Sequence, residues 1–375
     1  MSGTSINKFF SNEVSCVFAT DNFYAPYLAV TIESIIENSS PNNSYGIYVL
    51  EEDLSYEYKY KLKLLEKHNV KIEFVNVKDF INQYRPILHI HAYVTIATYF
   101  RFFICDLFKN FDKLVYLDCD IIVNCDIADL YNIDLNGNIA ACVRDIQIAS
   151  WNFQNLIKDR EYYLNVLKLD KIDNYFNAGV MVFDVRKLVE FKCKEKCINL
   201  LQKIKQPKYS DQCIMNSVLK DNVLLINLEW NFQNSIAKPI NIQNNYKNLF
   251  NEYLRQEVIN AQNNPKIIHY ICKKPWENLD IINSEKFWEY ARKTPFYEVI
   301  IYSNIMKKIQ KTLLSKSNKQ LNKQPNKQLN KKTNKNFYKN FVERIFSVKI
   351  LIQKNKKHKV ITILGIKVKF LSSKR

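Results

Sequence analysis

The stretch that decides the fold is Leu114-Val115-Tyr116-Leu117-Asp118-Cys119-Asp120-Ile121-Ile122-Val123. Its apolar, β-branched run stops at two carboxylates and then resumes. This pattern is typical of a buried parallel strand with charged residues at its carboxyl end. Residues i and i+2 of an extended chain project to the same side. We therefore predict that Asp118 and Asp120 point together into one pocket at the end of this strand.

The spacing of Asp118 and Asp120 also suits a metal site. Two adjacent unpaired carboxylates repel each other and cost free energy to desolvate, and a divalent cation relieves both problems. Oxygen ligands suit Mg²⁺ or Mn²⁺, which bind phosphate oxygens as further ligands. The same spacing fits the start of a solvated loop, so the motif alone leaves both interpretations open.

The basic charge of the chain is concentrated at its C-terminal end. The 375 residues carry a net charge of +18, and 47% of them are hydrophobic, which is typical of a globular protein. Residues 301–375 hold 21 Lys or Arg and a single acid, whereas residues 1–300 hold 34 basic and 36 acidic residues. The main part of the chain is thus nearly neutral, and an anionic partner is expected only for the basic end.

The cysteines and the N-terminus favour a cytoplasmic protein. The nine cysteines include no Cys-x-x-Cys pair, which fits small buried hydrophobes in a reducing compartment. Cys193 and Cys197 have helical spacing, but no histidine stands near them in sequence, so a zinc site is not predicted. Residues 1–13 lack a signal pattern, and no apolar stretch reaches the length of a membrane span.

Strands and helices alternate along the first half of the chain. Residues 14–20 predict a strand, and helical periodicity follows at 25–36 after the turn Asp21-Asn22-Phe23-Tyr24. Strands at 45–50 and 70–77 flank a helix at 56–68. This alternation predicts an α/β fold with a Rossmann-like, mostly parallel central sheet and flanking helices. Ligands of such sheets bind beyond the carboxyl ends of the strands, where Ala19, Thr20 and Asp21 lie.

The second half of the main part continues the pattern. We predict helices at 95–108, 152–169 and 211–219 and strands at 139–143, 180–183 and 223–228. Residues 229–264 are predicted to form an irregular segment that covers the site. A short buried strand predicted at 267–270 contains His269.

After Pro295 the composition changes. We predict a main domain at 1–296, a basic amphipathic helix and Lys/Asn/Gln-rich linker at 297–336, and a small basic β-rich segment at 337–375 with a hairpin turn near Gly365.

Six separated blocks of the chain carry residue patterns that belong together. They are Val17-Phe18-Ala19-Thr20-Asp21, Thr98-Tyr99-Phe100-Arg101, Leu117-Asp118-Cys119-Asp120, Phe176-Asn177-Ala178-Gly179, Ser210-Asp211-Gln212, and His269 through Lys274-Pro275-Trp276. In order and in kind, these blocks resemble glycosyltransferase family 8, which includes bacterial lipooligosaccharide galactosyltransferases and lipopolysaccharide glucosyltransferases. The resemblance covers roughly residues 14 to 290.

The resemblance implies a nucleotide-diphospho-sugar transferase fold of the GT-A type and a retaining, Mn²⁺- or Mg²⁺-dependent transfer of galactose or glucose from a UDP-sugar donor. It implies an acceptor among bacterial surface glycans such as lipooligosaccharide. The residues that it assigns to the metal are Asp118, Asp120 and His269. Those that it assigns to the nucleotide are Ala19, Thr20, Asp21 at the uracil edge, Tyr24 stacked on the base, Cys119 within the metal motif, and Lys274 at the diphosphate.

The resemblance also implies which residues surround the donor sugar. Arg101 and Asp145 would hold its hydroxyls, with Asn177, Ala178, Asp211 and Gln212 around the reacting carbon. An oxocarbenium-like centre favours such carbonyl and amide oxygens, and a metal plus one lysine stabilises the departing diphosphate. Because the Gln212 amide is a poor nucleophile, we favour attack on the same face over a covalent intermediate, and the sequence does not decide between them.

The block that follows His269 departs from the family pattern. It is one residue shorter, and Cys272 stands near the position of a family glycine. Backbone approach to the diphosphate can therefore differ, and either Lys273 or Lys274 could reach it. Arg144, before Asp145, replaces a residue that is more usually apolar.

Several of these residues also have plain structural interpretations. Arg101 could be a charge on a helix surface, Asn177 part of a turn, Asp211 the N-cap of a helix that starts at Gln212, and His269 a core histidine.

Two other functions are open from the sequence. A metal-dependent nucleotidyltransferase would need a Gly-rich phosphate loop after the first strand, where the chain has no glycine. The positive net charge suggests a nucleic-acid-binding protein, but the nearly neutral main part argues against this function, and we expect no nucleic acid as a partner.

The basic C-terminal region instead predicts binding to an anionic membrane surface, next to a lipid-linked saccharide acceptor at the cytoplasmic face of the inner membrane. A solvated basic linker without a partner is the alternative.

Overall fold

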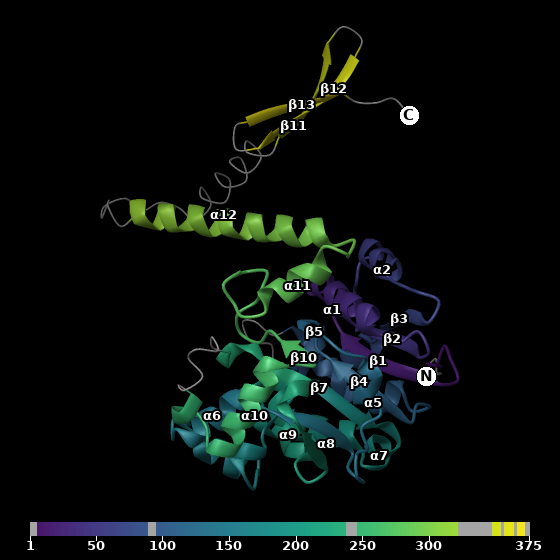
Figure 1. Ribbon diagram of the computed structural model, residues 1–375, viewed down its shortest axis with the longest axis vertical. Coiled ribbons are helices and arrows are strands. Elements are labelled where there is room, and N and C mark those ends of the chain that lie inside the picture. Colours follow the sequence, from purple (N-terminus) through teal and green to yellow (C-terminus); the bar gives the residue numbers. More distant parts are fainter. Residues whose placement is uncertain are drawn as a thin grey trace. The chain divides into compact units, whose positions relative to one another are not determined.

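The centre of the protein is a seven-stranded sheet with the strand order β3-β2-β1-β4-β7-β6-β8, seen in the computed structural model (Figure 1). The structure describes residues 6–88, 95–237, 246–321, 347–353, 356–363 and 366–371. Neighbouring strands are parallel except that β7 runs antiparallel to β4 and β6, so the predicted mostly parallel sheet is confirmed. The strands are β1 (Glu13–Ala19), β2 (Ser44–Glu51), β3 (Val70–Asn76), β4 (Lys113–Leu117), β6 (Ala140–Arg144), β7 (Phe176–Asp184) and β8 (Val223–Ile226).

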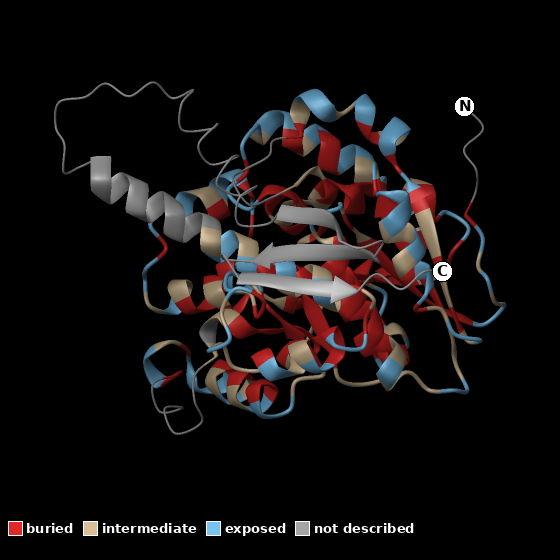
Figure 2. Ribbon diagram, turned by 90° about the horizontal axis from the view of Figure 1, so that it is seen from above, coloured by how far each residue is buried: buried red, intermediate tan, exposed pale blue. Residues whose placement is uncertain are grey.

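Alternate residues of the strands supply two apolar cores, one on each face of the sheet. In β1, Cys16 and Phe18 join one core and Val17 joins the other, because successive side chains of a strand point to opposite faces. Helices α1 (Ala25–Asn38) and α11 (Ser284–Ala291) supply the first core; α4 (Ile104–Leu107), α7 (Val185–Glu190), α8 (Cys193–Ile204) and α9 (Ser210–Leu219) supply the second. Figure 2 shows the buried interior between exposed helix surfaces. Both faces are thus covered, as the continuous apolar runs predict.

The deciding stretch is not one strand. β4 ends at Leu117, and Ile121–Val123 forms β5 in a second, three-stranded sheet with the order β5-β10-β9. β10 (Ile267–His269) pairs antiparallel with β5 and parallel with β9 (Phe232–Gln233). The prediction of a single strand that resumes after Asp120 was therefore wrong, because the Asp-Cys-Asp segment carries the chain from one sheet to another.

Four segments differ from the sequence prediction. The helix predicted at 152–169 was wrong in its bounds: α6 lies earlier, at Ile146–Phe153, because Asp145 caps it by accepting hydrogen bonds from the backbone N–H groups of Gln147 and Ile148. A short π-helix, Tyr162–Val166, lies within the rest of the predicted range. The irregular cover predicted at 229–264 contains α10 (Glu252–Asn263), which Asn251 caps at the N–H of Leu254. The predicted helix at 95–108 is mostly 3-10 (Ile96–Phe103), and α2 (Tyr56–Lys63) ends before His68. The shorter helices are α3 (Lys78–Asn82) and α5 (Ile127–Tyr131).

Contacts within the chain divide it into two units, Met1–Met306 and Lys307–Arg375. Helix α12 (Tyr297–Leu321) begins at the first residue of the predicted basic helix and linker, 297–336. The C-terminal strands β11 (Ser347–Gln353), β12 (Lys356–Ile363) and β13 (Ile366–Leu371) form an antiparallel sheet, and the predicted turn at Gly365 lies outside the described residues.

Among the described helices, none is long and apolar enough to cross a membrane. All nine cysteines lie in described segments and are free thiols, and Cys272 is the exposed one among them.

Candidate active site

Asp118, Asp120 and His269 lie together beside the end of β4. Nε2 of His269 is 3.3 Å from Oδ1 of Asp120 and 3.8 Å from Oδ2 of Asp118. One ligand atom from each of the three side chains lies within 4.8 Å of the other two. Strand register explains the convergence: His269 pairs with Ile121, and the N–H of Tyr270 donates to the carbonyl of Asp120 at 3.0 Å. A histidine about 150 residues away in sequence thus reaches the two aspartates through β10.

A chain of hydrogen bonds fixes the orientation of His269. The N–H of Gly179 donates to Oδ1 of Asn177, and Nδ2 of Asn231 donates to the same oxygen at 2.9 Å. The amide of Asn231 therefore turns its own Oδ1 toward Nδ1 of His269, at 2.9 Å. Because this oxygen can only accept, Nδ1 carries a proton, and Nε2 is the ring nitrogen that faces the aspartates. His269 is buried, as expected for a core histidine, but its second ring nitrogen faces Asp118 and Asp120.

Asn231 is fully buried, yet the sequence prediction missed it. It lies in an Asn-rich stretch in which no single asparagine is distinguished by its neighbours. Only the pairing of β9 with β10 places this side chain beside His269. The sequence held no signal that could have identified it.

Because Gly179 of β7 has no side chain, the side chains of His269 and Asp118 can lie directly beside it. A Cβ atom at this position would lie 2.3 Å from Cε1 of His269 and 2.7 Å from Oδ2 of Asp118. Contacts this short do not occur, so either side chain would have to move. Asn177 is part of β7 rather than of a turn, and it holds the backbone of Gly179 through its side chain.

Arg101 is buried and binds both Asp118 and Asp211. Its Nη2 is 2.9 Å from Oδ1 of Asp118, its Nε is 3.0 Å from Oδ2 of Asp211, and its Nη1 donates to the carbonyl of Ala178. Burial alone would lower the pKa of Arg101, but Asp211, Tyr116 and Asp118 raise it above its ordinary value. The interpretation of Arg101 as a surface charge is therefore wrong, and the guanidinium fixes the position of one metal-site carboxylate.

Asp211 lies in the first turn of α9 and does not cap it, because α9 begins at Ser210 and the N-cap residue is Tyr209. Its carboxylate instead accepts hydrogen bonds from Thr98 and Arg101. The N-cap interpretation of Asp211 is thus wrong, and the residue connects α9 to the 3-10 segment that carries Arg101.

Lys274 forms an ion pair with Oδ2 of Asp120 and donates to the carbonyl of Tyr270 at 2.7 Å. Burial alone would raise the pKa of Asp120, but Lys274 and then His269 hold it below its usual range. Lys273 is exposed. Cys272 has a φ of +64°, the left-handed conformation that favours glycine. Of the two lysines left open by the sequence, the described structure brings Lys274 to the site.

Asp145 and Gln212 are linked on the other side of β7. Oδ1 of Asp145 caps α6, and its Oδ2 accepts from Nε2 of Gln212 at 3.1 Å. Oε1 of Gln212 accepts from the N–H of Ala178 at 3.1 Å. Burial raises the pKa of Asp145, and the hydrogen bonds from Ile148 and Gln212 oppose this shift. The Gln212 amide is therefore held with its oxygen toward β7 and its nitrogen toward Asp145.

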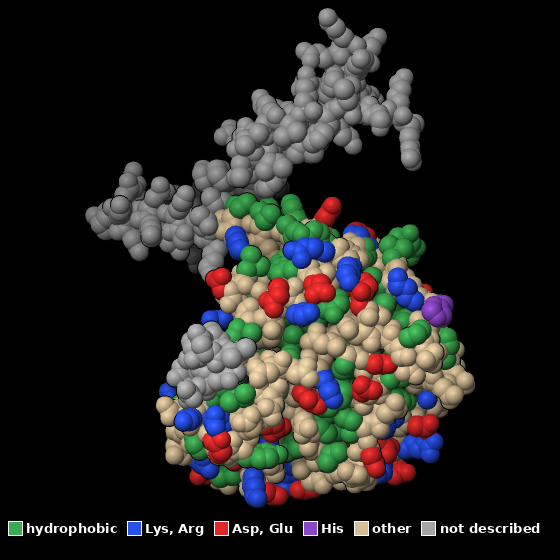
Figure 3. Space-filling view, viewed as in Figure 1, with side chains coloured by type: hydrophobic (Ala, Val, Ile, Leu, Met, Phe, Trp, Pro, Cys, Tyr) green, Lys and Arg blue, Asp and Glu red, His purple; other side chains and the backbone are tan. Residues whose placement is uncertain are grey.

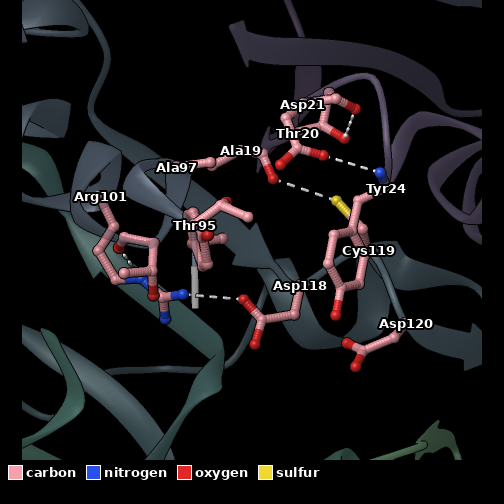
Figure 4. A pocket seen from close by; sticks show the side chains of 12 residues that line it. Ala19, Thr20, Asp21, Tyr24, Thr95, Ala97, Arg101, Asp118, Cys119 and Asp120 are labelled. Carbon is pink, nitrogen blue, oxygen red and sulfur yellow. Dashed lines mark hydrogen bonds and ion pairs between the residues drawn. The ribbon is translucent and has the colours of Figure 1, made fainter. Parts of the chain in front are cut away.

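A cleft opens beside Asp118 and Asp120, and it is lined by the residues predicted to contact the nucleotide except Lys274 (Figure 4). Oδ1 of Asp21 accepts from the N–H groups of Phe23 and Tyr24, and this turn holds the Tyr24 ring at the cleft wall. The thiol of Cys119 donates to the carbonyl of Ala19 at 3.2 Å, which ties the metal motif to the end of β1. The lining residues are Ala19, Thr20, Asp21, Tyr24, Thr95, Ala97, Thr98, Arg101, Tyr116, Asp118, Cys119 and Asp120.

The donor atoms at this site fit a divalent cation such as Mn²⁺ or Mg²⁺. Asp118 binds Arg101 with Oδ1 and turns Oδ2 toward His269, while Asp120 binds Lys274 with Oδ2 and turns Oδ1 toward His269. Each carboxylate thus keeps one oxygen for a ligand, next to Nε2 of His269. Two carboxylate oxygens and one imidazole are a donor set suited to Mn²⁺, and cleft space remains for phosphate oxygens.

Comparison with known proteins agrees with this geometry. The sequence profile described as "Glycosyl transferase family 8" matches residues 15–280. The chain belongs to glycosyltransferase family 8. The resemblance seen in the six blocks is therefore confirmed, and family 8 places the chain among glycosyltransferases rather than nucleotidyltransferases.

Two curated relatives are glycosyltransferases by name. A Haemophilus influenzae glycosyltransferase is 33% identical over 226 residues, which cover 59% of this chain and 64% of the relative. The lipopolysaccharide 1,2-glucosyltransferase of Escherichia coli K12 is 28% identical over 284 residues, which cover 74% of this chain and 77% of that protein. The chain thus matches somewhat less than two thirds of the length of the Haemophilus relative.

Solved structures establish the fold. The apo structure of the bifunctional glycosyltransferase WbbM has a TM-score of 0.69 at 30% identity, and the match covers 80% of this chain and 53% of WbbM. An active-site mutant of LgtC has a TM-score of 0.61 at 22% identity, covering 75% of this chain and 96% of LgtC. The family 8 chain therefore has the predicted GT-A type fold.

Proposed function

We propose that this family 8 protein is a retaining hexosyltransferase that moves galactose or glucose from a UDP-sugar to a bacterial surface glycan such as lipooligosaccharide. The names of two relatives support the substrate class: one E. coli relative is a lipopolysaccharide 1,2-glucosyltransferase, and another is the lipopolysaccharide glucosyltransferase WaaO. The galactosyltransferase LgtC, solved with donor and acceptor sugar analogues, shares the fold. The observation that carries the proposal is the convergence of Asp118, Asp120 and His269 beside an open cleft.

In this proposal, Asp118, Asp120 and His269 hold Mn²⁺ or Mg²⁺. The ion, when bound, supplies Lewis acidity to the diphosphate oxygens. Arg101 keeps Asp118 in place, and Asn231 keeps Nε2 of His269 directed at the site. Lys274 neutralises negative charge on the leaving diphosphate, which requires its ammonium to exchange Asp120 for a phosphate oxygen.

The nucleoside is proposed to bind at the end of β1. Asp21 contacts the uracil edge with the carboxylate oxygen that the turn leaves available, since Oδ1 accepts two backbone N–H groups. Tyr24 stacks on the base, and the backbone of Ala19 and Thr20 lines the same cleft. Cys119 connects this region to the metal motif through Ala19.

The donor sugar is proposed to lie among Arg101, Asp145, Asn177, Ala178, Asp211 and Gln212. Gln212 donates to Asp145 through Nε2 and accepts from Ala178 through Oε1, which supports a positioned amide dipole rather than a nucleophile. We therefore favour attack by the acceptor on the face from which UDP departs, with the acceptor proton passing to a diphosphate oxygen. Asp145, whose carboxylate is buried and hydrogen-bonded, orients Gln212 in this scheme.

The location of the enzyme is also a proposal. The 21 basic residues after residue 300 are proposed to bind the anionic cytoplasmic face of the inner membrane, where a lipid-linked acceptor would be presented. Residues 1–296 would then be the catalytic domain, 297–336 the basic helix and linker, and 337–375 a small basic β-rich segment.

The proposal is tested with a panel of UDP-sugars. The purified full chain is incubated with each UDP-sugar in MnCl₂, in MgCl₂ and in EDTA, and released UDP is measured. We expect release from UDP-galactose or UDP-glucose that requires the metal and is abolished by Asp120→Asn. The matched control is Asp221→Asn, an exposed aspartate on the surface, which should behave as the wild type. Release that is unaffected by EDTA, or no release from any UDP-sugar, would contradict the proposal.

A further inference from the structure

Helix α2 carries large apolar side chains on the side that faces solvent. Tyr56 and Tyr60 of α2 and Leu64, the C-cap residue directly after it, are 85%, 58% and 55% exposed, and their spacing of four residues places them on one face. The opposite side of the helix supplies Leu62 to the core, with Tyr58 packed against it. Packing against the core therefore explains the apolar residues on the inner face of α2, but it does not explain those on the outer face.

The first turns of α12 carry two more exposed side chains with large apolar surfaces. Tyr302 is 57% exposed and Ile305 is 49% exposed. The two helices adjoin, because the Tyr58 ring packs edge-on against Phe296, with centroids 5.1 Å apart, directly before α12. Figure 3 shows hydrophobic side chains over the beginning of α12 and others over α2, with charged side chains between the two groups. We call Tyr56, Tyr60, Leu64, Tyr302 and Ile305 the α2–α12 face.

The chemistry around this face suits the boundary between water and lipid. Lysines flank the apolar stripe, and three of them form ion pairs: Lys59 with Glu51, Lys61 with Glu57, and Lys63 with Glu66. Tyrosine rings combine an apolar body with a polar tip, and lysines place their stems on apolar surface while the ammonium stays in water. A surface of tyrosines, lysines and isolated aliphatic residues is typical of that boundary.

Charge indicates what kind of surface binds there. α12 continues from Ile305 directly into Lys307 and Lys308, and residues 301–375 carry 21 basic residues and one acid. Basic charge alone gives weak and salt-sensitive binding to a bilayer, and stable attachment usually needs a second, apolar contact. The α2–α12 face supplies such a contact on the folded unit from which the basic chain departs.

We propose that the α2–α12 face inserts its tyrosine and aliphatic side chains into the interface of an anionic bilayer, while the basic C-terminal region supplies the attraction. This inference rests on the membrane partner of the proposed function and adds a second, apolar contact site on the catalytic unit. The attachment therefore depends in part on Tyr56, Tyr60 and Leu64, which lie more than 230 residues before the basic region.

The test measures partition of the full chain between buffer and sedimenting vesicles of phosphatidylcholine with phosphatidylglycerol. A triple variant Tyr56→Ser, Tyr60→Ser, Leu64→Ser is compared with the wild type and with the triple variant Phe153→Ser, Tyr253→Ser, Leu279→Ser, whose side chains are 46%, 75% and 63% exposed at other sites. We expect the α2 variant to lower the partition coefficient about tenfold and the matched control to change it less than about twofold. A conservative variant, Tyr56→Phe with Tyr60→Phe, should keep wild-type binding, and unchanged melting temperatures show that the variants are folded.

Three results would overturn the inference. Equal binding of the α2 variant and the wild type would show that the basic region suffices. Equal losses in the α2 and control variants would show a nonspecific effect of surface polarity. A change from dimer to monomer in analytical ultracentrifugation, without a change in vesicle binding, would show that the face joins two copies of the chain. UDP release without vesicles tests the proposed enzyme separately, since the α2 variant should retain it if the enzyme is correctly assigned.

Discussion

Nδ1 of His269 lies 2.9 Å from Oδ1 of Asn231, and this contact determines which ring nitrogen faces Asp118 and Asp120. The amide of Asn231 is itself fixed, because its Nδ2 donates to Asn177, which also accepts from the N–H of Gly179. The geometry of the proposed metal site thus depends on a residue that contributes no ligand atom. Partners of this kind orient a metal-binding histidine and increase its basicity.

We expect Asn231→Ala to weaken Mn²⁺ binding, because His269 loses the acceptor that fixes its tautomer. Loss of such a partner typically lowers metal affinity about 10- to 100-fold. The measurement is the Mn²⁺ concentration that gives half-maximal UDP release, at saturating UDP-sugar. Asn231→Asp, which keeps an acceptor oxygen beside Nδ1, should lose less affinity than Asn231→Ala. Equal Mn²⁺ dependence of Asn231→Ala and wild type would contradict the assigned role.

Gly179→Ala should abolish activity through steric overlap with the metal triad. The new Cβ would lie 2.3 Å from Cε1 of His269, so the imidazole or Asp118 must move. We expect loss of metal-dependent UDP release by a factor of about 100 or more, since ångström-scale displacements at a reacting centre cost about that much. Gly137→Ala is the comparison: its φ of +83° strains an added side chain, but no atom lies within 4 Å. That variant should lose stability and keep activity.

Cys272→Gly should stabilise the protein slightly. The left-handed conformation at φ +64° costs a non-glycine residue about 1–2 kcal/mol, and the added freedom of glycine in the unfolded chain offsets about 0.4–1 kcal/mol of that. We expect a net gain of about 0.5 kcal/mol in the free energy of unfolding, measured by urea denaturation. Cys272→Ala retains the strain and should show no gain. A destabilised Cys272→Gly protein would show that the thiol makes a favourable contact.

Lys274 and Lys273 should differ sharply in their effect on donor use. Lys274→Met removes the ammonium that pairs with Asp120 and is proposed to reach the diphosphate, whereas Lys273 is exposed. We expect kcat/KM for the UDP-sugar to fall about 100-fold or more in Lys274→Met, and less than about threefold in Lys273→Met, because a charge-assisted contact in the transition state contributes at least about that factor. The reverse order of effects would assign the diphosphate to Lys273.

The sheet was predictable from the sequence because its strands are continuous apolar runs. β1 and β2 begin and end within one or two residues of the predicted positions, and alternate side chains of β1 do enter opposite cores. The error at residues 114–123 has a physical reason. Both halves of that stretch are buried strands, but the change of direction at Asp118-Cys119-Asp120 separates them into different sheets, and hydrophobicity does not encode direction.

The candidate site was predictable only where the sequence carries local signals. Asp118 and Asp120 were predicted because an apolar run stops at them, and His269 because Lys274-Pro275-Trp276 follows it in a block that resembles family 8; the structure brings the three side chains together. Asn231 was missed because its role depends on the pairing of β9 with β10, which no local pattern of residues 229–264 reveals. The start of α6 was misplaced although its signal was present: Asp145 precedes an apolar residue and caps the helix, in addition to binding Gln212.

The central claim is that two aspartates and one distant histidine hold a single divalent cation. It is tested most directly by electron paramagnetic resonance of Mn²⁺ added to the full chain in the presence of UDP, which counts bound ions without requiring an acceptor. We predict one bound Mn²⁺ per chain in the wild type and in the Asp221→Asn control, and loss of this ion in Asp120→Asn and in His269→Ala. One tightly bound Mn²⁺ that persists in both of the latter variants would contradict the account.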